Sequence, residues 1–89
     1  MTQQQVVNEQ VDVTALYFRK SKTGLKSFPK RIEYEGEALT FVESGLQIMV
    51  NKGQELIELF TMTDGSSDYR LRHDVTAQSW TLMTISQNA

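Results

Sequence analysis

The sequence predicts an all-β protein built as a small antiparallel meander. Hydrophobic and polar residues alternate over several short segments, which is the two-residue period of a half-buried strand. Glycine, asparagine, aspartate and serine interrupt these segments at intervals of about 8–12 residues, as is typical of turns. Because short connections join antiparallel neighbours, we expect about six or seven short strands that pair mostly in chain order.

The length of 89 residues is that of one domain. Residues 1–10 are polar and rich in glutamine, so we expect them to form a flexible N-terminal tail. Residues 11–86 form the predicted single β domain, and residues 87–89 are predicted to be a short C-terminal tail.

The first strand is predicted within residues 11–20, which are rich in β-branched and aromatic residues, and residues 21–24 interrupt it. The single proline, Pro29, cannot donate a ladder hydrogen bond, so it belongs at a strand start or an edge. Over residues 31–43 the alternation resumes on both sides of Gly36, which can adopt the positive φ of a tight turn. This stretch gives the clearest hairpin of the sequence.

A short strand at residues 46–50 and a turn at residues 51–53 follow. Residues 55–63 are ambiguous, because their hydrophobic positions fit both a strand and a helical stripe. The short length and the Thr-Met-Thr ending favour a strand that is covered on both faces. The remaining elements are a loop at residues 64–68, a strand at residues 69–74 and a last strand at residues 80–85.

Strands of this number and length fit an SH3-like or similar open barrel, in which curling of the sheet protects its edges. Tyr69 and Trp80 are expected in the core of this barrel, because large rings dominate the packing of small cores.

Composition limits the classes of function. The chain has no cysteine, which excludes disulfides and thiolate metal sites and favours a cytoplasmic location. No apolar run approaches the roughly 20 residues that span a bilayer, so we expect no membrane contact. A pI of about 5.3 argues against a protein that coats DNA, although it permits a local basic patch.

Catalytic signatures are missing from the sequence, so we expect neither enzymatic activity nor a cofactor nor a metal site. The single histidine, His73, precedes Asp74, and neighbouring side chains of a strand point to opposite faces. The aspartates and serines of residues 64–68 are ordinary turn residues. The alternating glutamates of residues 33–37 share one solvated environment, whereas an acid–base pair needs two different ones.

The charges are divided by sign along the chain. Six of the nine basic residues lie between residues 19 and 31 without an acidic residue among them. Residues 32–68 then contain eight acidic residues and one lysine. A surface of one sign attracts ligands of the opposite sign, whatever the net charge. Two aromatic residues, Tyr17 and Phe28, lie near these basic residues in the sequence. The predicted nucleic-acid-binding residues are therefore Arg19, Lys20, Lys22, Lys26, Lys30, Arg31, Tyr17 and Phe28.

These residues favour a small non-catalytic binding module whose ligand is single-stranded nucleic acid. Proteins that bind single strands combine positive charge along the phosphates with rings on which bases stack. The alternative is a protein–protein interaction domain or homo-oligomeric adaptor without nucleic-acid binding, joined through a sheet edge and complementary charge. The sequence leaves open whether the basic and acidic stretches share a surface.

Overall fold

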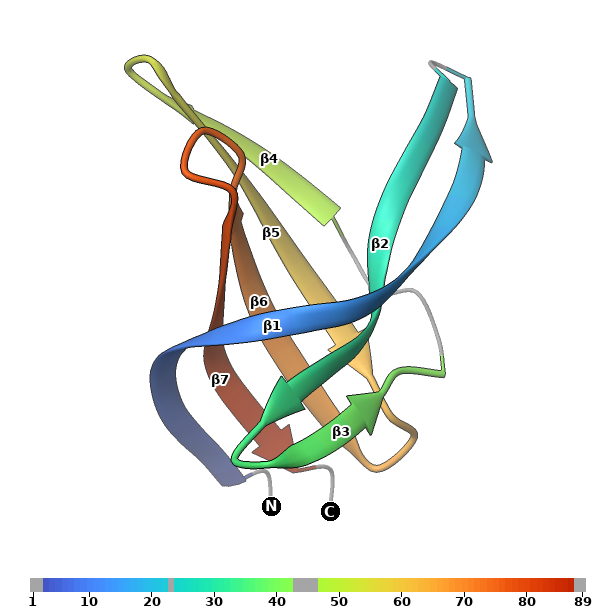
Figure 1. The fold of residues 1–89 in the computed structure, drawn as a ribbon, viewed down its shortest axis with the longest axis vertical. Helices are drawn as coiled ribbons and strands as arrows, with labels where there is room; N and C mark the ends of the chain where they lie inside the picture. Colours follow the sequence, from blue (N-terminus) through green and yellow to red (C-terminus); the bar gives the residue numbers. More distant parts are fainter. Residues whose placement is uncertain (1–2, 23, 43–46, 88–89) are drawn as a thin grey trace.

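The computed structural model describes residues 3–22, 24–42 and 47–87. The sheet order is β3-β2-β1-β7-β6-β5-β4, so every pair except β1–β7 joins strands that follow each other in the chain (Figure 1). The predicted all-β class and the small, open, barrel-like meander are confirmed. The strands are β1 Gln3–Ser21, β2 Gly24–Tyr34, β3 Glu37–Thr40, β4 Gln47–Lys52, β5 Glu55–Thr63, β6 Ser67–Asp74 and β7 Ser79–Gln87.

β1 belongs to two ladders. Its residues 3–11 pair with β7, and its residues 12–21 pair with β2. Asn8, with a φ of 51°, lies in one ladder irregularity, and Ala15 lies in another. Such irregularities bend a strand and increase its twist, so β1 can pass from one side of the barrel to the other.

The predicted flexible tail at residues 1–10 is wrong for residues 3–10, which form the first part of β1. Pairing with β7 explains the difference, because main-chain hydrogen bonds hold a strand even where its side chains are exposed, as Val6 is at 68%. Of the two predicted tails, residues 1, 2, 88 and 89 lie outside the described residues, and Gln87 ends β7.

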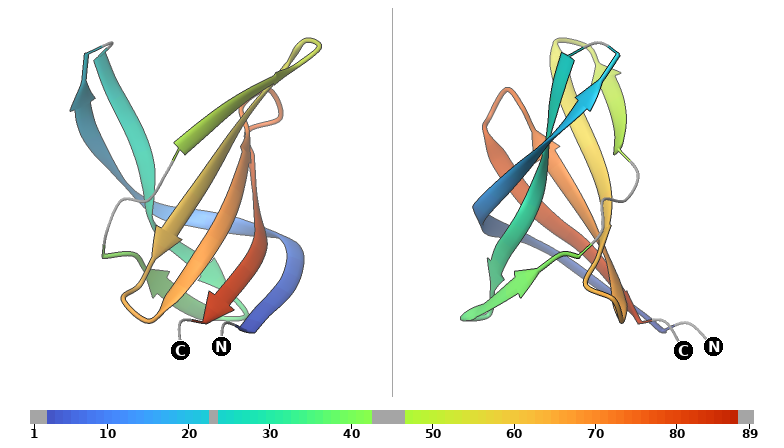
Figure 2. Two further views of the ribbon diagram at one scale, coloured as in Figure 1. Left: turned by 180° about the vertical axis from the view of Figure 1, so that it is seen from behind. Right: turned by 90° about the vertical axis from the view of Figure 1, so that its right-hand side faces the viewer.

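Two main-chain hydrogen bonds close one half of the barrel. The Phe41 N–H donates to the Lys30 carbonyl and the Val42 N–H donates to the Thr63 carbonyl, both at 2.9 Å. The segment after β3 thereby joins β2 to the end of β5. Away from this point, the β1–β2 and β4–β5 hairpins extend apart (Figure 2). We call the part around Phe41 the closed half, and the two hairpin extensions, residues 16–30 and 47–58, the open half.

The core is concentrated in the closed half. Ile32 of β2, Leu71 of β6 and Leu82 of β7 are fully buried at 0% exposure. Phe41 and Tyr69 add aromatic packing, with ring centroids 5.2 Å apart. We call the face of the sheet that carries this core the inner face. Tyr69 is therefore a core residue as predicted, and Trp80 packs against the same cluster while partly exposed.

The ambiguous residues 55–63 form the strand β5. Ile57 on one face and Phe60 on the other are both buried, so the strand is covered on both sides. The predicted hairpin around Gly36 is also confirmed, with positive φ at Glu35 and Gly36. Pro29 lies where β2 pairs with β1 alone, which is the edge position that its missing N–H requires. No helix that could cross a membrane occurs in the described part of the chain.

Candidate nucleic-acid interface

The predicted basic residues lie on or beside one projecting hairpin. β1 separates from β7 after Val11, and β3 joins β2 only from Arg31 onward. Between these points β1 and β2 pair with each other and with no other described strand. We call residues 16–30 the arm; it projects from the barrel in Figure 1 and in the left view of Figure 2.

Strand alternation gives the arm two faces. One face continues toward the core through Phe28, and we call it the inner face of the arm. The opposite face we call the outer face of the arm. The register places Tyr17, Arg19, Lys26 and Phe28 on the inner face, and Leu16, Phe18, Lys20, Leu25 and Ser27 on the outer face.

Four of the six predicted cations are exposed on the arm: Arg19, Lys20, Lys22 and Lys26. Arg19 lies directly opposite Lys26 in the ladder. Like charges at directly opposite positions of a strand pair repel each other, so this register concentrates positive charge at one point of the arm.

The other two predicted cations lie at the base of the arm and contact neighbours. The Lys30 Nζ is 6.0 Å from the centroid of the Tyr17 ring, which is the arrangement of a cation–π contact. The Arg31 Nε donates a hydrogen bond of 2.9 Å to the Thr14 hydroxyl. The structure therefore brings four exposed cations together along the arm, and it places Lys30 and Arg31 in contact with Tyr17 and Thr14 at the base of the arm.

Phe28 does not offer a ring for base stacking, contrary to the sequence-based prediction. It is 6% exposed, because the inner face of the arm runs into the core. Its ring stacks on Tyr17 at 5.3 Å and meets Phe60 edge-on at 5.7 Å. Tyr17 is half-buried by this contact, and its hydroxyl is buried without a hydrogen-bond partner among the described residues.

The exposed ring of the arm is Phe18, which is 64% exposed on the outer face. Leu16 and Leu25 of the same face are 49% and 69% exposed. Sequence reasoning did not select Phe18 because the face that meets the core was unknown. Once Phe28 is assigned to the core, the register places Phe18 on the opposite face.

The basic and acidic stretches are separated along β2. The exposed glutamates of residues 33–37 surround the β2–β3 turn, whereas the tip of the arm lies at the other end of β2 (Figure 1). Arg70 and Arg72 share a face, as alternation predicts, but this face lies opposite the buried Leu71. Arg70 and Arg72 therefore do not extend the positive charge of the arm's inner face.

Sequence reasoning missed a polar cluster on the inner face of the sheet. The His73 Nδ1 lies 2.9 Å from the Glu58 Oε1, and the imidazole stacks on Trp80 at a centroid distance of 4.1 Å. The Gln47 Nε2 donates to the Glu58 Oε2 at 2.5 Å. The register of the β5–β6 hairpin places Glu58 directly opposite His73, so the pair follows once the loop between these strands is known.

In the loop between β5 and β6, the side chain of Asp64 accepts several hydrogen bonds. Asp64 Oδ1 accepts hydrogen bonds from the Ser66 and Ser67 amides at 2.9 and 2.8 Å, and Oδ2 accepts from the Tyr69 hydroxyl at 2.7 Å. Burial alone would raise the pKa of Asp64, but these hydrogen bonds outweigh it and lower the pKa below 3.8. Burial, the hydrogen bond to Asp64 and its charge raise the pKa of Tyr69 to about 12.

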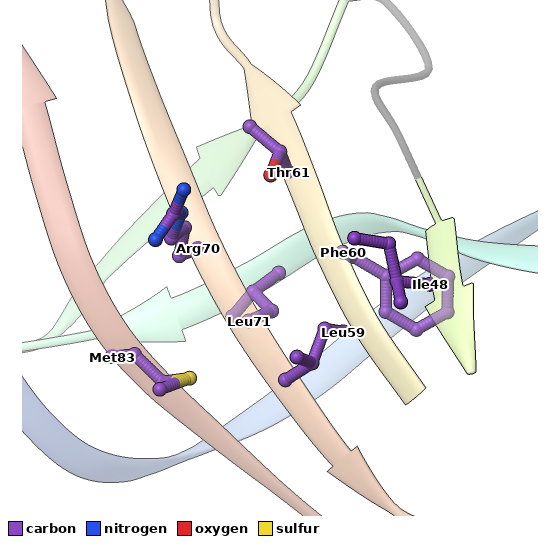
Figure 3. A pocket seen from close by; sticks show the side chains of 7 residues that line it. All are labelled: Ile48, Leu59, Phe60, Thr61, Arg70, Leu71 and Met83. Carbon is purple, nitrogen blue, oxygen red and sulfur yellow. The ribbon is translucent and has the colours of Figure 1, made fainter. Parts of the chain in front are cut away.

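A pocket of about 180 Å³ lies on the outer face of the sheet, between β4 and β7 (Figure 3). Its lining is mainly apolar, from residues such as Ile48, Leu59 and Met83, with Arg70 as the charged residue. Within the described ranges, no three histidine, aspartate or glutamate side chains gather as metal ligands.

No family model, no curated protein and no solved structure matches this chain. The geometry of the described residues is therefore the basis for assigning a function.

Proposed function

We propose that this chain is a small non-catalytic binding module whose arm contacts single-stranded nucleic acid. The observation that carries the proposal is the gathering of Arg19, Lys20, Lys22 and Lys26 in exposed positions on one projecting hairpin. Residues 16–30 themselves contain no acidic residue. Neutralising phosphates with lysine and arginine releases counterions, which drives sequence-independent binding.

The two faces of the arm support different contacts. Arg19 and Lys26 on the inner face are placed to hold one phosphate between them, and Lys20 and Lys22 add charge near the tip. Phe18 on the outer face offers a ring to one base, an interaction of about 1–3 kcal/mol. An exposed ring of this kind favours single strands, whose bases are free to leave their own stack. The absence of cysteine supports contact with nucleic acid in the cytoplasm.

The test of the charges is fluorescence anisotropy of labelled single-stranded DNA and RNA, titrated over a salt series. Affinity should fall steeply with salt. Lys22→Gln/Lys26→Gln should flatten the slope of log affinity against log salt by about 1.4, or roughly 0.7 for each lost phosphate contact. Arg70→Gln/Arg72→Gln removes the same charge from the outer face of the sheet and should leave the slope unchanged. An absence of binding at low salt, or equal effects of both variants, would reject the proposal.

The test of the ring uses the same titration. Phe18→Ala should weaken binding to single strands by roughly 5- to 150-fold, whereas Phe18→Tyr should retain most of the affinity. Leu25→Ala, at an equally exposed position of the same face, is the matched control and should have little effect. Binding to duplex DNA should be insensitive to Phe18→Ala. Equal losses for Phe18→Ala and Leu25→Ala would show that the ring does not stack on bases.

A further inference from the structure

We propose that two copies of this chain pair through the free edge of β4, in an antiparallel register centred on Met49. The pairing is independent of nucleic-acid binding by the arm. β4 is the last strand of the sheet, and β5 is its one neighbour among the described strands. A strand in this position directs half of its backbone N–H and C=O groups away from the sheet, where they can pair with another chain.

The two edges of the sheet differ in their protection. β3, at one edge, has 4 residues and begins with Glu37. Short, charged edge strands resist pairing with another chain. β4, at the other edge, has 6 residues and pairs with β5 without a bulge. β4 carries one charged residue, Lys52, at its end, whereas residues 47–51 contain neither a charged residue nor a proline, so the middle of this edge lacks the usual features that prevent pairing.

Three consecutive side chains of β4 are apolar and exposed. Ile48, Met49 and Val50 are 48%, 54% and 37% exposed. Ile48 and Val50 point to the outer face of the sheet and Met49 to the inner face. Ile48 also borders the apolar pocket that Leu59 and Met83 line, so the apolar surface continues inward from the edge (Figure 3).

A second copy of β4 fits this edge because the sequence of residues 47–51, Gln-Ile-Met-Val-Asn, reads nearly the same in both directions. In an antiparallel pair centred on Met49, Ile48 lies opposite Val50 of the partner subunit, and Gln47 lies opposite the partner's Asn51. Pairs of β-branched residues stabilise neighbouring strands. A two-fold axis forms each of these contacts twice.

The carboxamide pair adds a polar reason for this register. In one chain the Gln47 Oε1 is buried without a hydrogen-bond partner among the described residues, while its Nε2 donates to Glu58. Asn51 shares the inner face with Gln47 and carries two N–H donors. Pairing about Met49 brings the partner's Asn51 to the position opposite Gln47, so the two carboxamides are neighbours on the inner face; the buried Gln47 Oε1 is covered within its own chain and takes no part in this contact.

The area of contact limits the expected affinity. One pair of six-residue strands buries less than the roughly 1,200 Å² of a standard interface. The dimer should therefore be weak and should depend on protein concentration. Sedimentation velocity between about 10 µM and 1 mM should show a shift from monomer to dimer. A monomer over this whole range would overturn the proposal.

Two charge variants test the register. Ile48→Lys/Val50→Lys places lysine opposite lysine and should abolish association. Ile48→Lys/Val50→Glu places lysine opposite glutamate in the proposed register and should restore association at least tenfold relative to the double-lysine variant. Both positions are exposed, so circular dichroism should show folded chains. Equal association of the two variants would overturn the register centred on Met49.

A variant of the arm tests whether two chains associate through the exposed apolar residues of the arm instead of through β4. Leu16→Lys/Leu25→Lys introduces the same charge on the exposed outer face of the arm and should leave association unchanged. A monomer in this variant would assign the interface to the arm instead.

Hydrogen exchange of the unmodified chain is the second measurement, should a β4 variant not fold. Protection of β4 amides should rise with concentration while that of β3 amides stays constant, and constant protection of β4 would overturn the proposal.

Discussion

Phe60 in β5 and Phe18 in β1 are both phenylalanines on strands, yet they have opposite surroundings. Phe60 is 1% exposed, and its ring lies 5.7 Å from Phe28 and 5.5 Å from Trp80. Phe18 is 64% exposed on the arm. The buried ring contributes to folding, whereas the exposed ring leaves its surface available to a partner. The comparison indicates that stability resides in the core and that the extensions of the open half are free to serve as contact surfaces.

The two extensions of the open half differ from each other in chemistry. The arm gathers exposed cations, whereas residues 47–51 of β4 are uncharged and largely apolar at the sheet edge. A polyanion matches the first surface and another strand matches the second. Because different residues form the two surfaces, the lysine variants of the arm and the charge variants of β4 should act independently.

The largest effect is expected for Phe60→Ala, which should lower the free energy of unfolding by about 3–5 kcal/mol. The reason is a cavity at the junction of the arm and the core, where Phe60 meets Phe28 and Trp80. Denaturant unfolding followed by circular dichroism measures this loss. A loss below about 1 kcal/mol would contradict the assignment of the core as the source of stability.

The next largest loss of stability is expected for a change in the loop between β5 and β6, at the end of the closed half. Asp64→Ala should cost about 1–3 kcal/mol, because two loop amides and the Tyr69 hydroxyl would lose their acceptor. Tyr69→Phe removes one of these hydrogen bonds and should cost less. In the double variant the two losses should be clearly non-additive, since both residues share one hydrogen bond. Additive losses would show that this bond contributes nothing to stability.

The pKa shifts of Asp64 and Tyr69 predict how the stability of the fold depends on pH. The folded state lowers the pKa of Asp64 below 3.8, so the stability from its carboxylate is fully present above about pH 4. It should be lost as the pH falls through the lowered value. The pKa of Tyr69 is raised to about 12, so its contribution is present below pH 10 and should be lost between about pH 10 and 12. Unfolding midpoints over this range should show both declines, and Asp64→Ala should reduce the acidic one.

The sequence predicts the features of this fold that depend on local pattern. The turn at Gly36 and the strand at residues 55–63 both follow from alternation and from residues that favour turns. The pairing of residues 3–10 with β7 was missed, because main-chain hydrogen bonds leave no hydrophobic pattern there. The burial of Phe28 was missed for another reason: alternation shows which residues share a face but not which face meets the core.

The candidate site shows the same limit. The clustering of basic residues was visible in the sequence, and the structure places four of them in exposed positions on the arm. The choice between Phe18 and Phe28 as the exposed ring required the tertiary contact with Phe60. The pairing of Glu58 with His73 required the register of β5 against β6. Contacts of this kind depend on strand pairing over a distance, which a single sequence specifies only weakly.

A smaller contribution to stability is expected from the contact between Glu58 and His73, which lies where the closed and open halves meet. Their side chains are 16% and 21% exposed, so solvent weakens the interaction between them. A double-mutant cycle with Glu58→Gln and His73→Gln should give a coupling of about 0.5–1 kcal/mol. A coupling near zero would show that the contact of 2.9 Å adds nothing to the pairing of β5 with β6.

The smallest effect is expected for Phe18→Ala, which should change the free energy of unfolding by less than about 0.5 kcal/mol. The ring is 64% exposed, so its removal opens no cavity. Denaturant unfolding of this variant, set beside that of Phe60→Ala, gives the sharpest contrast between the arm and the core. A loss above 2 kcal/mol would mean that the arm folds back onto the barrel in solution and buries Phe18. In that case a weakening of nucleic-acid binding in the same variant would report unfolding rather than the loss of a stacking ring.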